Sequence, residues 1–247
     1  MNIVNGFLKF LIVISSIGII LAVYFISTSM YSYHKSSEKY KEINTIYQEE
    51  RKKGNSDVFK KMSSINEDYL GWLSLPNTNI HYPIVKTDNN DFYLSHNFYL
   101  EKDKAGAIFM DSKNSSTKLD QNTIIYGHDM KDGSMFGNLS KYLDETYTLN
   151  HSLIQTNFLD NTYDWEIFSV SIANESDSEW MKVSFPEQTE FEDFLSKIKN
   201  NSSIFTNTKI EQAETILTLS TCSTDDTERL VIHAKLLTKG RETDETN

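Results

Sequence analysis

Residues 215–222 read Thr-Ile-Leu-Thr-Leu-Ser-Thr-Cys, and their side chains alternate in chemical character. Because successive side chains of a strand point to opposite faces, this alternation predicts a strand with Thr218, Ser220 and Cys222 on one face and two leucines on the other. Cys222 therefore faces away from the leucines, and it ends its strand just before a polar segment.

A second strand is predicted immediately afterwards, over Leu230–Leu237, with alternate apolar residues on one face and Arg229 and His233 on the opposite face. The link between the two strands has six residues, 223–228, which favours an antiparallel hairpin. In that hairpin position 222 lies opposite position 229, with the two Cβ atoms roughly 5 Å apart. A thiol and a guanidinium are then neighbours, whereas His233 pairs with Thr218, roughly 13 Å from Cys222.

Six further strands are predicted upstream from apolar alternation and turn signals. They are Trp72–Leu75, Ile80–Ile84, Ala107–Met110, Thr123–Tyr126, Leu153–Phe158 and Trp165–Ile172. Between the sixth and seventh strands, residues 190–200 carry apolar side chains at helical spacing. The fold class is therefore mostly β, an eight-stranded barrel with a few helices.

The first thirty residues are a separate segment. Phe7 to Ile26 forms a run of twenty residues with Lys9 as its only charge, which is long enough to cross about 30 Å of hydrocarbon as a helix. We interpret residues 1–30 as a transmembrane anchor. A cleaved secretory signal is the alternative, because residues 27–29 (Ser-Thr-Ser) resemble a cleavage site. The lysines on the two sides of the span leave its orientation open.

Residues 31–56 form the next predicted segment, a helical stalk. Within it Tyr40, Ile43 and Tyr47 recur at helical spacing in an otherwise polar stretch, which predicts a solvated amphipathic helix. The barrel is expected over 57–238, beginning with a short helix capped by Asp57, and residues 239–247 form a polar tail.

Composition excludes several classes of function. The formal net charge is −11 and only three residues are arginine, so the basic surface that binds nucleic acid is missing. With Cys222 as the single cysteine, an intramolecular disulfide and a cysteine zinc cluster are excluded. The acidic stretch 88–91 lacks the spacing and the closing Glu of a calcium loop. We expect no metal and no cofactor.

Cys222 is a candidate nucleophile because it ends a strand on the polar face beside Arg229, whose charge favours a thiolate. The alternatives are a small buried cysteine and an arginine that pairs with acids of the loop. A nucleophilic cysteine needs a base, and six histidines are available. His128 ranks first, since it follows the apolar strand 123–126 and the flexible Gly127 at a strand end.

Two motifs carry a resemblance to a known family. Residues 218–222 (Thr-Leu-Ser-Thr-Cys) followed by Arg229 resemble the Thr-Leu-x-Thr-Cys and downstream Arg signature of the sortases, and residues 126–130 (Tyr-Gly-His-Asp-Met) resemble the histidine motif of class B. Class B sequences are also similar, in the same order, at Gly71–Leu73, Ile80–Val85, Asn90–Leu94 and Gly106–Asp111. The resemblance covers about Asp57 to Leu237 and includes the helix-bearing insertion before the cysteine strand.

This resemblance implies a sortase-type barrel, an N-terminal anchor in the cell membrane with the catalytic domain outside the cell, and cysteine transpeptidase activity. Cys222 would be the nucleophile, His128 the acid and base, and Arg229 the oxyanion stabiliser together with the backbone N–H of Ser223. By the same analogy a peptide groove would be lined by Asn90, Leu94, Tyr126 and Ser220. The implied partners are sorting-signal peptides of surface proteins, an amine acceptor from peptidoglycan or a pilin, and the membrane.

Two rival functions are open, and a third fits worse. An L,D-transpeptidase also uses Cys and His in a β-rich domain, but it places Ser-His-Gly-Cys around the nucleophile, whereas Leu-Ser-Thr precedes Cys222 here. A papain-like hydrolase fits worse, because its cysteine comes before its histidine in the chain, whereas His128 precedes Cys222 here. A membrane-tethered binding or sensor domain would keep the barrel without catalysis, and loss of activity in Cys222→Ala would distinguish an enzyme from it.

Overall fold

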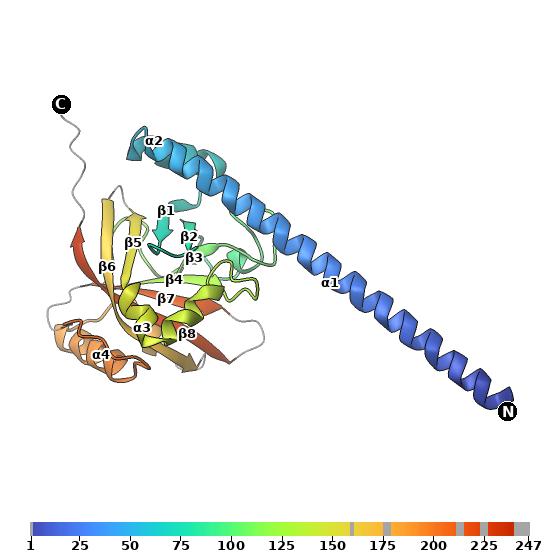
Figure 1. Cartoon of the computed structure of the whole chain (residues 1–247). Coiled ribbons are helices and arrows are strands. Elements are labelled where there is room, and N and C mark those ends of the chain that lie inside the picture. Colours follow the sequence, from blue (N-terminus) through green and yellow to red (C-terminus); the bar gives the residue numbers. More distant parts are fainter. Residues whose placement is uncertain (1, 159–160, 175–178, 211–214, 223–226, 240–247) are drawn as a thin grey trace.

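The computed structural model describes residues 2–158, 161–174, 179–210, 215–222 and 227–239 (Figure 1). Its eight strands close into a barrel, which confirms the predicted fold class. The strands are β1 Tyr69–Ser74, β2 His81–Val85, β3 Ile108–Met110, β4 Asn122–His128, β5 Leu153–Phe158, β6 Asn161–Asn174, β7 Ile216–Cys222 and β8 Glu228–Lys239.

The order of strands around the barrel is β1-β2-β3-β4-β7-β8-β6-β5. Two neighbouring pairs, β2 with β3 and β4 with β7, run parallel, and the other neighbouring pairs are antiparallel. The β7–β8 hairpin has the predicted register, with Thr218 opposite His233. Its short connection limits how far the two strands can slip, which is why the sequence could predict the register.

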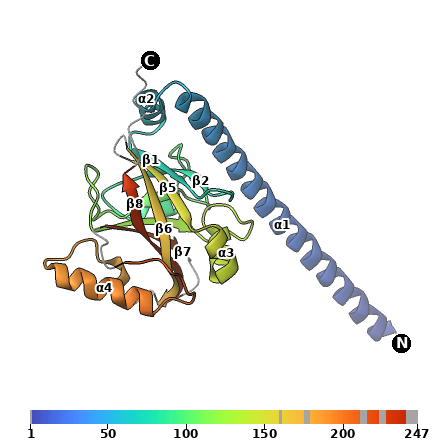
Figure 2. The ribbon, with the colours of Figure 1, turned by 60° about the vertical axis from the view of Figure 1, so that its left-hand side comes forward.

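The helices lie at the two ends of the barrel and over one side of it (Figure 2). The α-helices are α1 Asn2–Arg51, α2 Asn55–Ile65, α3 Glu145–Asn150 and α4 Gln188–Asn200. Three short 3₁₀ segments, which the sequence analysis did not predict, are η1 Phe92–Leu94, η2 Gly137–Leu143 and η3 Glu179–Met181. The first turn of α2 contains Asp57, but the N-cap is Gly54, which corrects the predicted cap.

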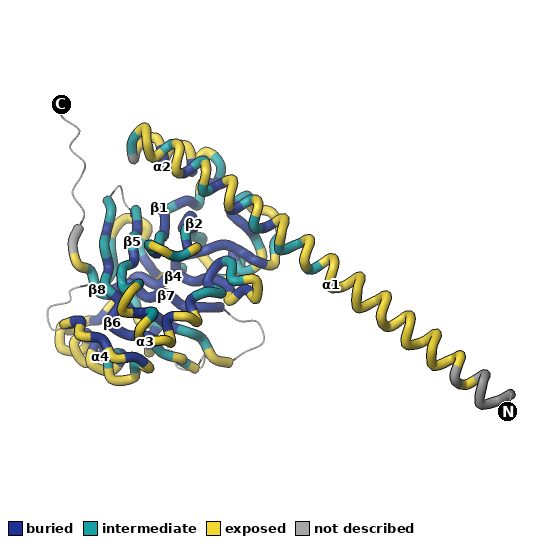
Figure 3. Tube along the Cα trace, in the orientation of Figure 1, coloured by how far each residue is buried: buried dark blue, intermediate teal, exposed yellow. Residues whose placement is uncertain are grey.

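The helix α1 is unbroken over fifty residues, and its N-terminal part projects away from the barrel (Figure 1). Phe7 and the large apolar side chains from Phe10 to Tyr31 are exposed (Figure 3). Among the described residues this is one helix long and apolar enough to cross a membrane. The predicted span and the predicted stalk are therefore parts of one helix.

The C-terminal part of α1 packs onto the barrel. Tyr40, Ile43 and Tyr47 are all buried, and Tyr47 stacks on Trp72 of β1 at 3.8 Å between ring centroids. The structure thus differs from the solvated stalk expected from sequence. The helical spacing was read correctly, but the apolar stripe gains free energy by covering the barrel instead of facing water.

The core has two parts. One large cluster fills the barrel and extends under α1 and α2, and a second cluster lies between α4 and the outside of the sheet. The predicted helix 190–200 corresponds to α4, whose Phe191 and Phe194 belong to the second cluster with Ile216 of β7. Because it is covered on both faces, β7 is buried along its whole length.

Candidate active site

The site is built on β4 and β7, which lie side by side in parallel register. Their pairing runs from Asn122 opposite Ile216 to His128 opposite Cys222. Parallel neighbours end at the same edge of a sheet, so the two last residues of these strands lie next to each other. The residue before the histidine is Gly127, and a Cβ there would lie 2.4 Å from the Ile108 side chain and 2.9 Å from the Phe136 ring, so a larger residue would force these side chains to move.

The imidazole of His128 is held at both ring nitrogens. Its Nδ1 lies 3.2 Å from the carbonyl oxygen of Cys222, and its Nε2 lies 2.7 Å from that of Leu94. A carbonyl oxygen only accepts hydrogen bonds, so a neutral ring can satisfy one of these contacts and an imidazolium can satisfy both. The ring is buried and has one fixed orientation beside the backbone of Cys222.

The N-terminal end of strand β8 brings Arg229 to the same edge. Extending the observed β7–β8 register by two residues beyond the pair Ser220–Val231 puts Arg229 opposite Cys222, as the hairpin argument predicted. The guanidinium is half-buried, and its Nη1 donates a hydrogen bond of 3.1 Å to the carbonyl oxygen of Thr221. The cation is therefore held against the strand that carries the thiol.

Tyr126 lies beneath this edge, two residues before His128 on β4. Burial is the largest cause of its raised pKa, to which Asp111 and Cys222 add, while the charge of Arg229 lowers it. Its hydroxyl donates a hydrogen bond of 2.9 Å to Oδ2 of Asp111. Tyr126 thus lies near enough to the thiol and the guanidinium to be affected by their charges, and its hydroxyl is held by a buried carboxylate.

The Asp111 carboxylate also holds Asn90. The Asn90 amide nitrogen donates to the same Oδ2 atom at 3.0 Å, and its side-chain oxygen accepts the backbone N–H of Ser112 at 2.8 Å. Two of the four residues expected to line a groove, Asn90 and Tyr126, therefore share one buried acceptor. Sequence reasoning assigned Asp111 no role, although its position directly after the apolar strand 108–110 was an available signal.

The other predicted groove residues have different environments. Leu94 is half-buried and contributes its carbonyl oxygen to His128. Ser220 lies opposite Tyr126 across the β4–β7 pair and has no exposed surface. Ser223, the expected second oxyanion donor, lies outside the described residues.

The remaining five histidines are not part of this edge. His81 bonds to a serine and a carbonyl of its own turn, and His96 and His151 each stack on an aromatic ring four residues earlier. His34 is exposed on α1. His233 is buried between Phe168 and Phe194 on the α4 side of the sheet.

Comparison with known proteins bears on the family of this chain. The sortase-domain family model matches residues 73–237. Sortase B of Listeria monocytogenes is 43% identical over 186 residues, which cover 74% of this chain and 75% of that protein.

Two solved structures are similar in fold. The Staphylococcus aureus sortase B–substrate complex has a TM-score of 0.79 at 28% identity and covers 84% of this chain and 98% of that chain. A sortase B complexed with triglycine has a TM-score of 0.78 at 28% identity and covers 83% and 98%. With its family match, its curated relative and its closed barrel in agreement, the chain belongs to the sortase family of cysteine transpeptidases, and within it to the class B sortases.

Proposed function

We propose that this sortase cleaves a C-terminal sorting signal of surface proteins after a threonine, holds the acyl fragment as a thioester on Cys222, and passes it to an amine. The observation that carries the proposal is the in-register pair of His128 and Cys222 at one edge of the barrel, with Arg229 on the adjoining strand. This is the arrangement of nucleophile, acid and base, and fixed cation that acyl transfer needs.

In the first half of the reaction the Cys222 thiolate attacks the threonine carbonyl carbon. The negative charge on the resulting oxyanion is stabilised by Arg229, with the backbone N–H of Ser223 as a second donor. His128 then protonates the departing amine, so the peptide C–N bond breaks and a thioester remains on Cys222. The contact between Arg229 and the Thr221 carbonyl supports its role, since it holds the cation next to the nucleophile.

In the second half an incoming amine attacks the thioester. His128 accepts a proton from that amine, a new amide bond forms, and the thiolate of Cys222 leaves. When water takes the place of the amine, the same steps give hydrolysis, so the enzyme would also act as a cysteine peptidase.

The partners follow from the same chemistry. A sorting peptide would lie along Asn90, Leu94, Tyr126 and Ser220, and the amine would come from peptidoglycan or from a pilin. The substrate complex and the triglycine complex of related sortases support a peptide and an amine as partners.

The proposal includes a location in the cell membrane. The exposed apolar part of α1 would cross the bilayer once, and the barrel would lie on the extracellular side, where surface proteins are attached. The division into an anchor at 1–30, a helical segment at 31–56, a barrel at 57–238 and a tail at 239–247 belongs to this proposal. Apart from Lys239, the tail lies outside the described residues.

The test is the intact mass of the full-length chain in a nonionic detergent, incubated with a pool of sorting-signal peptides and no amine. We expect an acyl adduct that ends in threonine, absent in Cys222→Ala and strongly reduced in His128→Ala and Arg229→Ala. His34→Ala is the matched control, because His34 is exposed on α1, and it should label like the wild type. If no peptide labels the protein and Cys222 also resists alkylation in the folded state, the thiol is structural. The protein would then be better described as a binding domain without catalytic activity.

A further inference from the structure

The helix α1 reaches the barrel through a buried tyrosine. The hydroxyl of Tyr40 donates a hydrogen bond of 2.6 Å to the carbonyl oxygen of Gly106, and its side chain is 7% exposed. Burial raises the pKa of Tyr40 well above its usual value, so the hydroxyl remains a neutral donor. Tyr40 lies nine residues after Tyr31, the last large apolar side chain of the exposed part of α1, or roughly 14 Å along the helix.

Gly106 lies directly behind the ring of His128. Its φ is +59°, and a Cβ at this position would lie 3.0 Å from Cδ2 of His128 and 2.4 Å from the Tyr93 carbonyl oxygen. The carbonyl oxygen of Leu94, which contacts Nε2 of His128, would be 3.2 Å from that Cβ. The glycine whose carbonyl Tyr40 holds therefore lies beside both the imidazole and its hydrogen-bond acceptor, with no room for a side chain between them.

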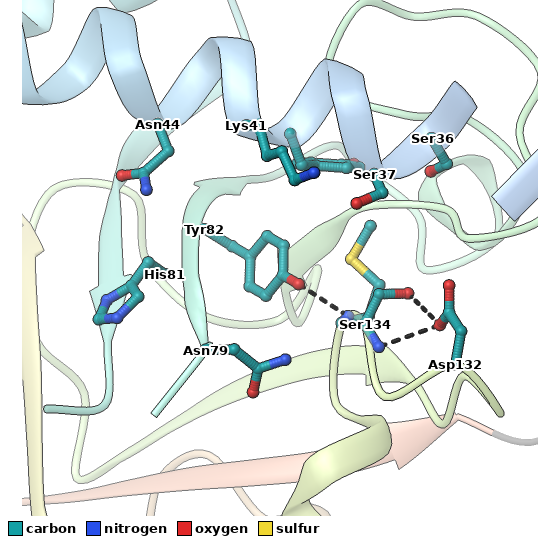
Figure 4. A pocket seen from close by; sticks show the side chains of 11 residues that line it. Ser36, Ser37, Lys41, Asn44, Asn79, His81, Tyr82, Asp132 and Ser134 are labelled. Atoms are coloured by element: carbon teal, nitrogen blue, oxygen red, sulfur yellow. Dashed lines mark hydrogen bonds between the residues drawn. The ribbon is translucent and has the colours of Figure 1, made fainter. Parts of the chain in front are cut away.

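A second set of contacts leads from Tyr40 to the backbone of His128. The Tyr40 ring packs edge-on against Tyr82 of β2, at 5.4 Å between centroids. The Tyr82 hydroxyl accepts a hydrogen bond of 2.9 Å from the backbone N–H of Met135. This bond lies beside a cavity of about 280 Å³ between α1 and the loop that contains Met135 (Figure 4). The next residue, Phe136, donates its N–H to the carbonyl oxygen of His128 at 3.0 Å.

The two sets of contacts meet at one residue, with the first ending on the ring of His128 and the second on its carbonyl group. We propose that Tyr40 is a positioning residue for His128: it fixes the turn behind the imidazole and, through Tyr82, the loop that follows it. The inference rests on the proposed role of His128 as acid and base. Because α1 is continuous, the helix proposed to anchor the protein is also part of the support of its active site.

The alternative is that Tyr40 contributes only to packing. Tyr47 provides the matched control, because it lies two turns later on the same helix, is equally buried, and stacks on Trp72. Its hydroxyl interacts with Asn157 and Arg51, neither of which contacts His128 in the structure. Each variant removes one hydroxyl from a buried tyrosine of α1, so Tyr47→Phe controls for the general cost of that loss without a connection to His128.

The experiment compares Tyr40→Phe, Tyr47→Phe and the wild type as full-length chains in detergent. We expect Tyr40→Phe to lower kcat for peptide transfer about 10-fold with KM unchanged, since small misplacement of a catalytic group is costly. Tyr47→Phe should leave kcat unchanged. Tyr82→Phe should lower kcat as well, and combining it with Tyr40→Phe should cost less than the sum of the two.

A second readout does not depend on turnover. The ring resonances of His128, assigned by their loss in His128→Ala, should move in Tyr40→Phe and stay in place in Tyr47→Phe. If the wild type forms no acyl adduct and its Cys222 resists alkylation while these resonances move, the proposed function fails and the positioning role stands. If both tyrosine variants keep the wild-type resonances, or lose kcat equally in step with their melting temperatures, the positioning role is overturned.

Discussion

The imidazole of His233 should make the fold sensitive to acid in a way that one substitution removes. Its ring is 1% exposed between Phe168 and Phe194, and neither ring nitrogen has a hydrogen-bond partner among the described residues. Burial lowers its pKa from 6.5 to about 3, because the charged form would lose its hydration without gaining a partner. Between these two values the unfolded chain binds a proton that the folded chain does not.

The sign follows from that difference in bound protons. As the pH falls through 6.5 toward 3, the unfolded state is increasingly favoured, so the free energy of unfolding decreases. Between pH 7 and pH 5 the contribution of His233 alone is about 2 kcal/mol. For a chain of this length that is a change of roughly 4–8 °C in melting temperature.

The substitution His233→Leu tests the reasoning, because leucine fills a similar space between the two phenylalanines and does not titrate. The full-length chain and the variant are unfolded with urea in nonionic detergent at pH 7 and pH 5. We expect the variant to be at least as stable at pH 7 and to lose about 2 kcal/mol less than the wild type on going to pH 5.

The control is His34→Leu, which removes an exposed histidine and should keep the wild-type dependence on pH. Equal losses of stability in the wild type and in His233→Leu would refute the reasoning, since His233 would then bind its proton equally well in both states.

Three further substitutions probe the support of the site. Gly106→Ala would bring a Cβ to 3.0 Å from His128 at a φ of +59°, so we expect kcat to fall about 10-fold or more. An unchanged kcat in steady-state kinetics would show that this close approach of residue 106 to His128 does not matter for catalysis. Ile43→Ala, at a fully buried position of α1, should lower the free energy of unfolding by about 2–5 kcal/mol in a urea titration, and no loss would mean that the helix does not pack on the barrel. Asp111→Asn removes the charged acceptor of the Tyr126 hydroxyl, which should raise KM for a sorting peptide about 10-fold. A KM equal to that of the wild type would show that this carboxylate does not contribute to peptide binding.

Much of the fold was visible in the sequence because it is encoded locally. Apolar alternation predicted all eight strands within a few residues of their observed bounds, and the six-residue link predicted the register that brings Arg229 toward Cys222. His128 was ranked first among six histidines because it ends an apolar strand. In each case the signal lies in residues that are near one another in the chain, where side-chain periodicity and loop length are sufficient.

Several predictions went wrong or stayed open where the answer depends on distant contacts. The amphipathic pattern of Tyr40, Ile43 and Tyr47 is the same for a helix in water and for one that covers the barrel, and only the structure shows that it is buried. Similarly, nothing near Asp111 in sequence indicates that its carboxylate accepts hydrogen bonds from both Asn90 and Tyr126.

The sequence by itself determined which segments are strands, which residues are candidates for the chemistry, and that the N-terminus is an apolar helix. Only the tertiary structure decided that β4 and β7 are parallel neighbours, which puts His128 beside Cys222 although ninety-four residues separate them in the chain. The physical reason is that a parallel pairing needs a long crossover connection and is stabilised by the packing of the whole barrel, so no short stretch of residues encodes it.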